Sequence, residues 1–165
     1  MLSGLLVESW RRQAACVNDL VEFGGADRLD WKASEDGWSI GVQLCHVHQV
    51  RSHWLRKASG LPFDELPAAF TAVDGEWVPL QGYEAICGAL KASEAALESW
   101  LAGALDREGP AGNYDHPLFL LQHMIWHEGY HVGLIMLALR LGGAEPSEEW
   151  EEEHLWSRWR VDDWE

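Results

Sequence analysis

Two histidines one helical turn apart, His127 and His131, are the residues of this chain best placed to do chemistry. They lie in its most apolar segment, Pro117–Leu141. Residues four positions apart on a helix project from one face. That face also carries Leu120, His123, Met124, Leu134, Ala138 and Leu141. Such a face points into a protein core, and a buried imidazole needs a partner. The pattern therefore predicts either a divalent metal site, since imidazole is a common metal ligand, or two histidines hydrogen-bonded in a polar pocket.

The residue after the first histidine adds a second interpretation. Residues 127–131 read HEGYH and match the H-E-x-x-H string of zinc metalloproteases. In such enzymes the Glu, here Glu128, polarises the zinc-bound water, and a third ligand comes from elsewhere in the chain. Glu128 is therefore the candidate catalytic acid or base. Asp115 and His116 are further acid–base groups that spacing alone does not place.

Composition restricts the class of protein. The chain has 165 residues, of which 47% are hydrophobic, enough for the core of one domain. Its formal net charge of −15 argues against a nucleic-acid partner, because phosphates would be repelled. Three cysteines without C-x-x-C spacing fit reduced thiols in a cytoplasmic protein.

Neither a signal peptide nor a membrane span is expected. The first helical segment carries Glu8, Arg11 and Arg12 and has no long apolar stretch. The apolar segment around the two histidines is interrupted by His, Glu and Gly. We therefore expect a cytoplasmic protein that does not cross a membrane.

Hydrophobic periodicity predicts an all-α fold with almost no strand signal. Four helices are expected, over residues 3–23, 38–60, 82–105 and 115–143. Glycine pairs end the first and the last, and Pro117 suits the first turn of the last. A proline-containing connection, residues 61–81, should lie outside the bundle. The prediction is a four-helix bundle, a fold that builds metal sites from inward-facing side chains.

The bundle domain is expected to span residues 1–146, followed by an acidic, Trp-rich extension over residues 147–165. This extension contains Trp150, Trp156, Trp159 and Trp164. Large aromatic side chains favour packing of the extension on the bundle, and the alternative is that Trp156 or Trp159 lines the substrate pocket. The last helix is apolar nearly all round, so a second possibility is that the first or fourth helix forms the interface of a homodimer.

The second helix offers His46, His48 and His53 as a third ligand. Periodicity alone slightly favours His48, which lies nearer the centre of the apolar face. Cys45 points about 100° away from His46 on an ideal helix and is expected to pack rather than bind. His123 is expected to be a core histidine bonded to the second helix, with a role beside the ligands as the alternative.

Two segments resemble the DinB-like (DinB/YfiT) family. Residues 38–46, WSIGVQLCH, are similar to its W-S-x-x-x-x-L-x-H opening, and residues 123–133, HMIWHEGYHVG, resemble its H-x-x-x-H-x-x-x-H-x-G segment. The two segments lie in the family's order, and the resemblance extends from residue 3 to about residue 146. The Gly pair at 142–143 also fits.

The resemblance implies a four-helix bundle in which His46, His127 and His131 hold one divalent cation, most readily zinc or nickel. It places Glu128 at a variable position. Members often carry Arg-Gly-Gln after the last ligand, whereas this chain has Val132-Gly133-Leu134 and so an apolar rim. The family includes thiol-dependent transferases and isomerases.

We therefore expect a metal-dependent enzyme that acts on a small electrophile. It would either transfer a low-molecular-weight thiol to this electrophile or hydrolyse it. Three protein ligands leave coordination positions open, as catalytic metal sites do. The alternative function is a non-catalytic metal-binding bundle of the stress response. An open coordination position beside a pocket favours the enzyme, and a closed coordination sphere favours the alternative.

Overall fold

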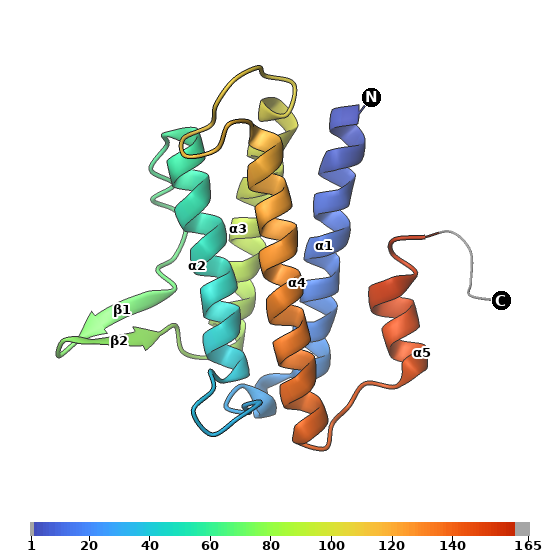
Figure 1. The fold of residues 1–165 in the computed structure, drawn as a ribbon. Coiled ribbons are helices and arrows are strands. Elements are labelled where there is room, and N and C mark those ends of the chain that lie inside the picture. Colours follow the sequence, from blue (N-terminus) through green and yellow to red (C-terminus); the bar gives the residue numbers. More distant parts are fainter. Residues whose placement is uncertain (1, 161–165) are drawn as a thin grey trace.

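The computed structural model describes residues 2–160 and is built around four long helices (Figure 1). They are α1 (Leu2–Gly24), α2 (Ile40–Ser59), α3 (Tyr83–Ala104) and α4 (Pro117–Leu141). α2 packs against α3 and α4, and α1 packs against the same two helices. α2 and α3 run in the same direction, so the chain must return along the bundle between them (Figure 1). The predicted all-α bundle with a long second connection is confirmed.

Local capping explains where the two helices that carry the histidines begin and end. Ser39 precedes α2 and its side chain accepts a hydrogen bond from the Val42 N–H, while Gly60 ends the helix with a φ of 71°. His116 caps α4 in the same manner, accepting from the Leu118 N–H, and Pro117 opens the first turn. These signals are local, which is why the sequence predicts both helices to within about two residues.

The connection between α2 and α3 contains a hairpin that the sequence analysis did not predict. Strand β1 (Phe70–Val73) pairs antiparallel with β2 (Glu76–Pro79). The turn residues Asp74 and Gly75 both have positive φ, 52° and 87°. Asp-Gly is the preferred pair for such a two-residue turn, so the signal was present, but the strands are too short and exposed to show clear alternation.

A buried ion pair crosses the centre of the bundle. Arg51 on α2 donates to both carboxylate oxygens of Glu128 on α4, at 2.6 and 2.9 Å, and neither side chain is exposed. The guanidinium also donates to the Leu90 carbonyl and lies 5.0 Å from the centroid of the Trp10 ring. Each charge of the pair is thus compensated inside the core, as a buried charge requires. The pair fixes α2 against α4.

α4 fully buries half of the eight residues of its predicted apolar face, while His123, His127 and Leu134 are half-buried. Leu120, Met124, His131 and Ala138 are buried, whereas Leu141 at the end of the helix is 63% exposed.

In residues 2–160, no helix combines the length and the apolarity needed to cross a membrane.

The C-terminal segment lies alongside α1 (Figure 1). It consists of α5 (Glu148–Glu151) and the π-helix η2 (Glu152–Trp156). Leu155 is buried, and its carbonyl lies near the Cys16 thiol. Asp19 on α1 accepts a hydrogen bond from the Arg158 guanidinium and lies 2.9 Å from Nδ1 of His154. Trp164, part of the predicted extension, lies outside the described residues.

Candidate metal centre

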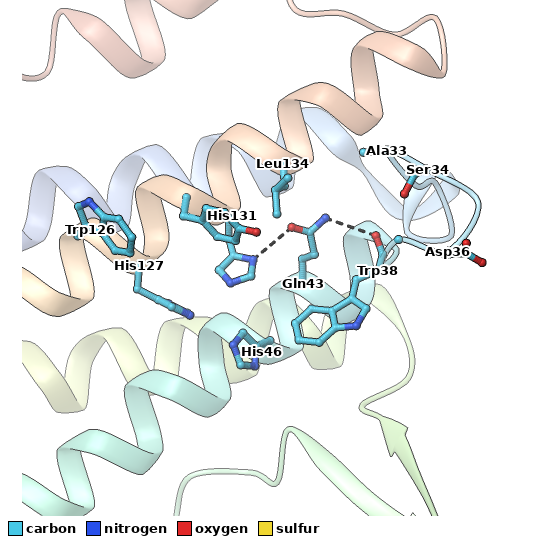
Figure 2. A pocket seen from close by; sticks show the side chains of 12 residues that line it. Ala33, Ser34, Asp36, Trp38, Gln43, His46, Trp126, His127, His131 and Leu134 are labelled. Carbon is cyan, nitrogen blue, oxygen red and sulfur yellow. Dashed lines mark hydrogen bonds between the residues drawn. The ribbon is translucent and has the colours of Figure 1, made fainter.

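Three imidazoles, one from α2 and two from α4, converge inside the bundle (Figure 2). One ring nitrogen from each of His46, His127 and His131 lies within 4.8 Å of the others. The ring centroids are 5.2 Å apart for the two pairs that include His46, and 4.6 Å apart for His127 and His131. His131 is buried and the other two are half-buried. The structure therefore brings together the three residues that the family resemblance implied.

The other histidines of α2 lie elsewhere. His48 is buried on the side of α2 that faces the crossover connection, with Nε2 2.8 Å from the Pro67 carbonyl oxygen. His53 is exposed. Periodicity favoured His48 because it correctly identified the more buried position. The contacts of His48 on that face are with the connecting segment and with the Ala89 backbone of α3, away from the two histidines of α4.

Two glutamines on α2 orient the rings. The Gln43 Oε1 lies 3.2 Å from Nδ1 of His131, and Oε1 of Gln49 lies 3.3 Å from Nδ1 of His46. An amide oxygen only accepts, so each contact places the ring proton on Nδ1 and leaves the Nε2 lone pair free. Metal-binding histidines typically have this arrangement, in which the second ring nitrogen donates to a neighbouring acceptor. Gln43 is itself held by a hydrogen bond from Nε2 to the Trp38 carbonyl.

Electrostatics keep two of the imidazoles neutral. Burial lowers the pKa of His127 to about 4, assisted by repulsion from His131 and His46, and burial with repulsion from His46 lowers the pKa of His131 to about 4. The neutral ring is the form that binds a metal. The Nδ1 atom of His127 is buried, and no group in residues 2–160 hydrogen-bonds to it. Neutral rings at this spacing, with one nitrogen unsatisfied, fit a divalent cation.

A pocket of about 640 Å³ opens over the three rings. Its wall is mainly apolar and comes from α4, the start of α2 and the loop before α2. The lining residues are Ala33, Ser34, Asp36, Gly37, Trp38, Gln43, His46, Trp126, His127, Tyr130, His131 and Leu134. The Trp38 ring is nearly parallel to that of His131, with centroids 6.4 Å apart. Val132, expected at the rim, packs against the core instead. A bound cation would therefore face a ligand-sized space.

The structure does not bring the predicted catalytic residue, Glu128, to this pocket. Its carboxylate is fully buried and both oxygens are taken up by Arg51. Adjacent helical residues project about 100° apart, so Glu128 turns into the core while His127 faces the pocket. His116 caps α4, and Asp115 is exposed and does not line the pocket.

Two predictions about nearby residues have different outcomes: His123 has another hydrogen-bond partner than expected, and Cys45 packs as expected. His123 is bonded to Tyr114, whose hydroxyl lies 2.7 Å from Nδ1, and not to a group of α2, although its ring does contact Trp54 on that helix. Cys45 packs as expected: it is 2% exposed, and burial raises its pKa to about 11. A thiol with that pKa is protonated at neutral pH and is a poor metal ligand.

Sequence reasoning missed Gln43 and Trp38 as parts of the site. Gln43 precedes His46 by three residues and so shares its helix face, which is a signal that could have found it. Trp38 belongs to the family-like segment 38–46, but nothing in the sequence indicates that it lines the pocket.

Comparison with known proteins gives one result. No curated protein and no solved structure matches the chain. The family model of the DinB superfamily matches residues 5–135, which include all three histidines of the cluster. With its helical bundle and its three convergent histidines, the chain belongs to the DinB superfamily.

Proposed function

We propose that this protein is a metal-dependent enzyme that joins a low-molecular-weight thiol to a small apolar electrophile. His46, His127 and His131 would hold one divalent cation, zinc or nickel. The observation that carries the proposal is the position of the three rings, which meet beneath an open pocket and not inside a closed core. Three protein ligands leave at least one coordination position open. When bound, the cation supplies Lewis acidity, which lowers the pKa of a coordinated thiol or water.

The pocket residues define the kind of acceptor. The lining contains no Lys or Arg among the described residues, while Trp38, Trp126, Tyr130 and Leu134 supply apolar surface. Apart from the cation itself, the lining offers an anionic acceptor no positive charge, and Asp36 would repel it, so an uncharged apolar acceptor is favoured. In the reaction the thiol loses its proton, the sulfur forms a bond to the electrophilic carbon, and the displaced group leaves with the bonding electrons.

Proton transfer needs a group other than Glu128, whose oxygens are occupied. Asp36 is the carboxylate that lines the pocket, and its side chain is exposed to the solvent. Its carboxylate lies on the loop at the rim of the pocket, away from the three rings (Figure 2), so we propose that it receives the thiol proton by way of water in the pocket.

The test is a panel of thiols and electrophiles. Protein without a histidine tag would be loaded with zinc or nickel, and glutathione, cysteine and coenzyme A would be assayed against 1-chloro-2,4-dinitrobenzene, monochlorobimane and a small ester. We expect the wild type to accelerate at least one pair and His131→Ala to lose that acceleration. His53→Ala, which alters an exposed histidine of the same helix, is the matched control and should keep it. Equal rates for wild type and His131→Ala across the panel would favour the non-catalytic metal-binding function.

A further inference from the structure

A second hollow lies beside the metal pocket, between α1, α4 and the C-terminal segment. It has a volume of about 490 Å³ and is lined by Gln13, Ile125, Trp126, Gly129, Tyr130 and Trp159. Trp126 and Tyr130 line both spaces. The two rings, one helical turn apart, are therefore a shared wall. A molecule that occupies one hollow can contact the same aromatic surface as a molecule in the other.

Gln13 is the unexpected residue of this hollow. It lies on the inner face of α1 and is 6% exposed as a whole residue, yet no group in residues 2–160 hydrogen-bonds to its side-chain amide. The amide atoms themselves are not enclosed by protein and reach the hollow, where they can exchange hydrogen bonds with water or with a bound molecule. The amide lines the hollow, where a bound molecule could satisfy it.

The remaining wall is aromatic and anchored. Trp159 follows Arg158, whose side chain donates to Asp19 and whose carbonyl accepts from Nη1 of Arg12 at 2.9 Å. These contacts hold Trp159 beside α1. Gly129 completes the floor, and a Cβ built there meets no atom within 4 Å.

The lining thus combines three aromatic rings and one amide with no charged side chain. Aromatic walls favour flat ligands, and an amide both donates and accepts hydrogen bonds. We propose that this hollow binds a flat, uncharged aromatic group that carries a hydroxyl or amide for Gln13. In the proposed function, on which this part rests, that group is the distal end of the acceptor whose electrophilic carbon lies in the metal pocket.

The hollow can be tested in metal-free protein with two probes of similar shape, 2-naphthol and 2-methylnaphthalene, by fluorescence and NMR titration. Gly129→Leu places a side chain in the hollow and should weaken both probes at least tenfold. Gly133→Leu is the matched control, because it alters an exposed glycine one turn along α4 that also has no atom within 4 Å of its Cβ and does not line the hollow. It should leave both affinities unchanged.

Gln13→Leu tests the hydrogen bond separately. Loss of one such bond corresponds to about a tenfold loss of affinity, so 2-naphthol should weaken by that factor while 2-methylnaphthalene keeps its affinity. In the wild type, 2-naphthol should shift the side-chain amide resonances of Gln13. Circular dichroism of each variant checks that the bundle is intact.

Three results would overturn the proposal: equal binding by Gly129→Leu and Gly133→Leu, equal effects of Gln13→Leu on both probes, or no binding of either probe to the wild type. A wild-type dimer that Gly129→Leu converts to a monomer, with no probe bound, would identify this face as an interface between copies and would also reject it. Because no metal is present, failure of the thiol reaction leaves these measurements unaffected. The two proposals can therefore fail independently.

Discussion

The buried ion pair allows a strong prediction about Glu128. Glu128→Gln removes the carboxylate charge and leaves the Arg51 guanidinium, which is 0% exposed, with only the Leu90 carbonyl, the Trp10 ring and one amide oxygen as partners. Breaking a buried pair by removing one partner typically costs about 3–5 kcal/mol. The amide oxygen can still accept one hydrogen bond, so we expect the lower end, about 3 kcal/mol. For a chain of this length that corresponds to a Tm lowered by about 6–12 °C.

Urea unfolding and calorimetry would measure this loss, and a double-mutant cycle would assign it to the pair. Arg51→Met with Glu128→Leu should recover most of the stability, because an apolar replacement of both partners removes the buried charges together. Metal stoichiometry of folded Glu128→Gln at low temperature should equal that of the wild type. A free energy of unfolding within about 0.5 kcal/mol of the wild type, the usual range for a surface substitution, would refute the reasoning. Loss of activity without loss of stability would instead return Glu128 to the role of a catalytic base.

Three further predictions concern the histidine cluster. His127→Ala should abolish stoichiometric metal binding, measured by elemental analysis, while helical circular dichroism is retained; undiminished metal would count against the site. Gln43→Leu should lower metal affinity about 10–100-fold, the usual effect of removing a group that orients a ligand, and the exposed Gln49→Leu should have a smaller effect in the same competition titration; the reverse order would contradict the assigned hydrogen bonds. Because the pKa values of His127 and His131 are lowered from 6.5 to about 4 in the fold, the unfolded chain binds more protons between these values, so metal-free protein should lose stability as pH falls from about 6.5 to 4. Urea midpoints across this range should fall less steeply for His131→Ala than for the wild type, and identical slopes would show that His131 does not contribute.

The helices could be predicted from the sequence because their signals are local. Ser39, Gly60 and Pro117 act within one turn of the chain, and the apolar periodicity of α4 is internal to that helix. The hairpin at Asp74-Gly75 had a local signal as well, but its short, exposed strands gave no pattern to support it.

The site was harder to predict because its contacts join distant residues. Arg51 and Glu128 are 77 positions apart, and nothing in either helix indicates that they pair. A lone arginine on an apolar face does predict some buried partner, and Glu128 can be identified as that partner only once α2 and α4 are adjacent. For the same reason the choice between His46 and His48 depended on which element covers each face of α2. Family resemblance supplied that information and periodicity could not.

The hydrogen bonds from His131 through Gln43 to the Trp38 carbonyl have a thermodynamic consequence. Trp38 lines the wall that an acceptor would touch, and His131 is one of the three rings of the cluster. A ligand that shifts the Trp38 backbone therefore changes the hydrogen bond between Gln43 and the imidazole. In the other direction, a cation that fixes the imidazole favours one position of Gln43 and of the Trp38 carbonyl. Linkage between two binding equilibria is reciprocal. The cation should strengthen acceptor binding by the same factor by which the acceptor strengthens binding of the cation, so substrate would itself protect the protein against chelators.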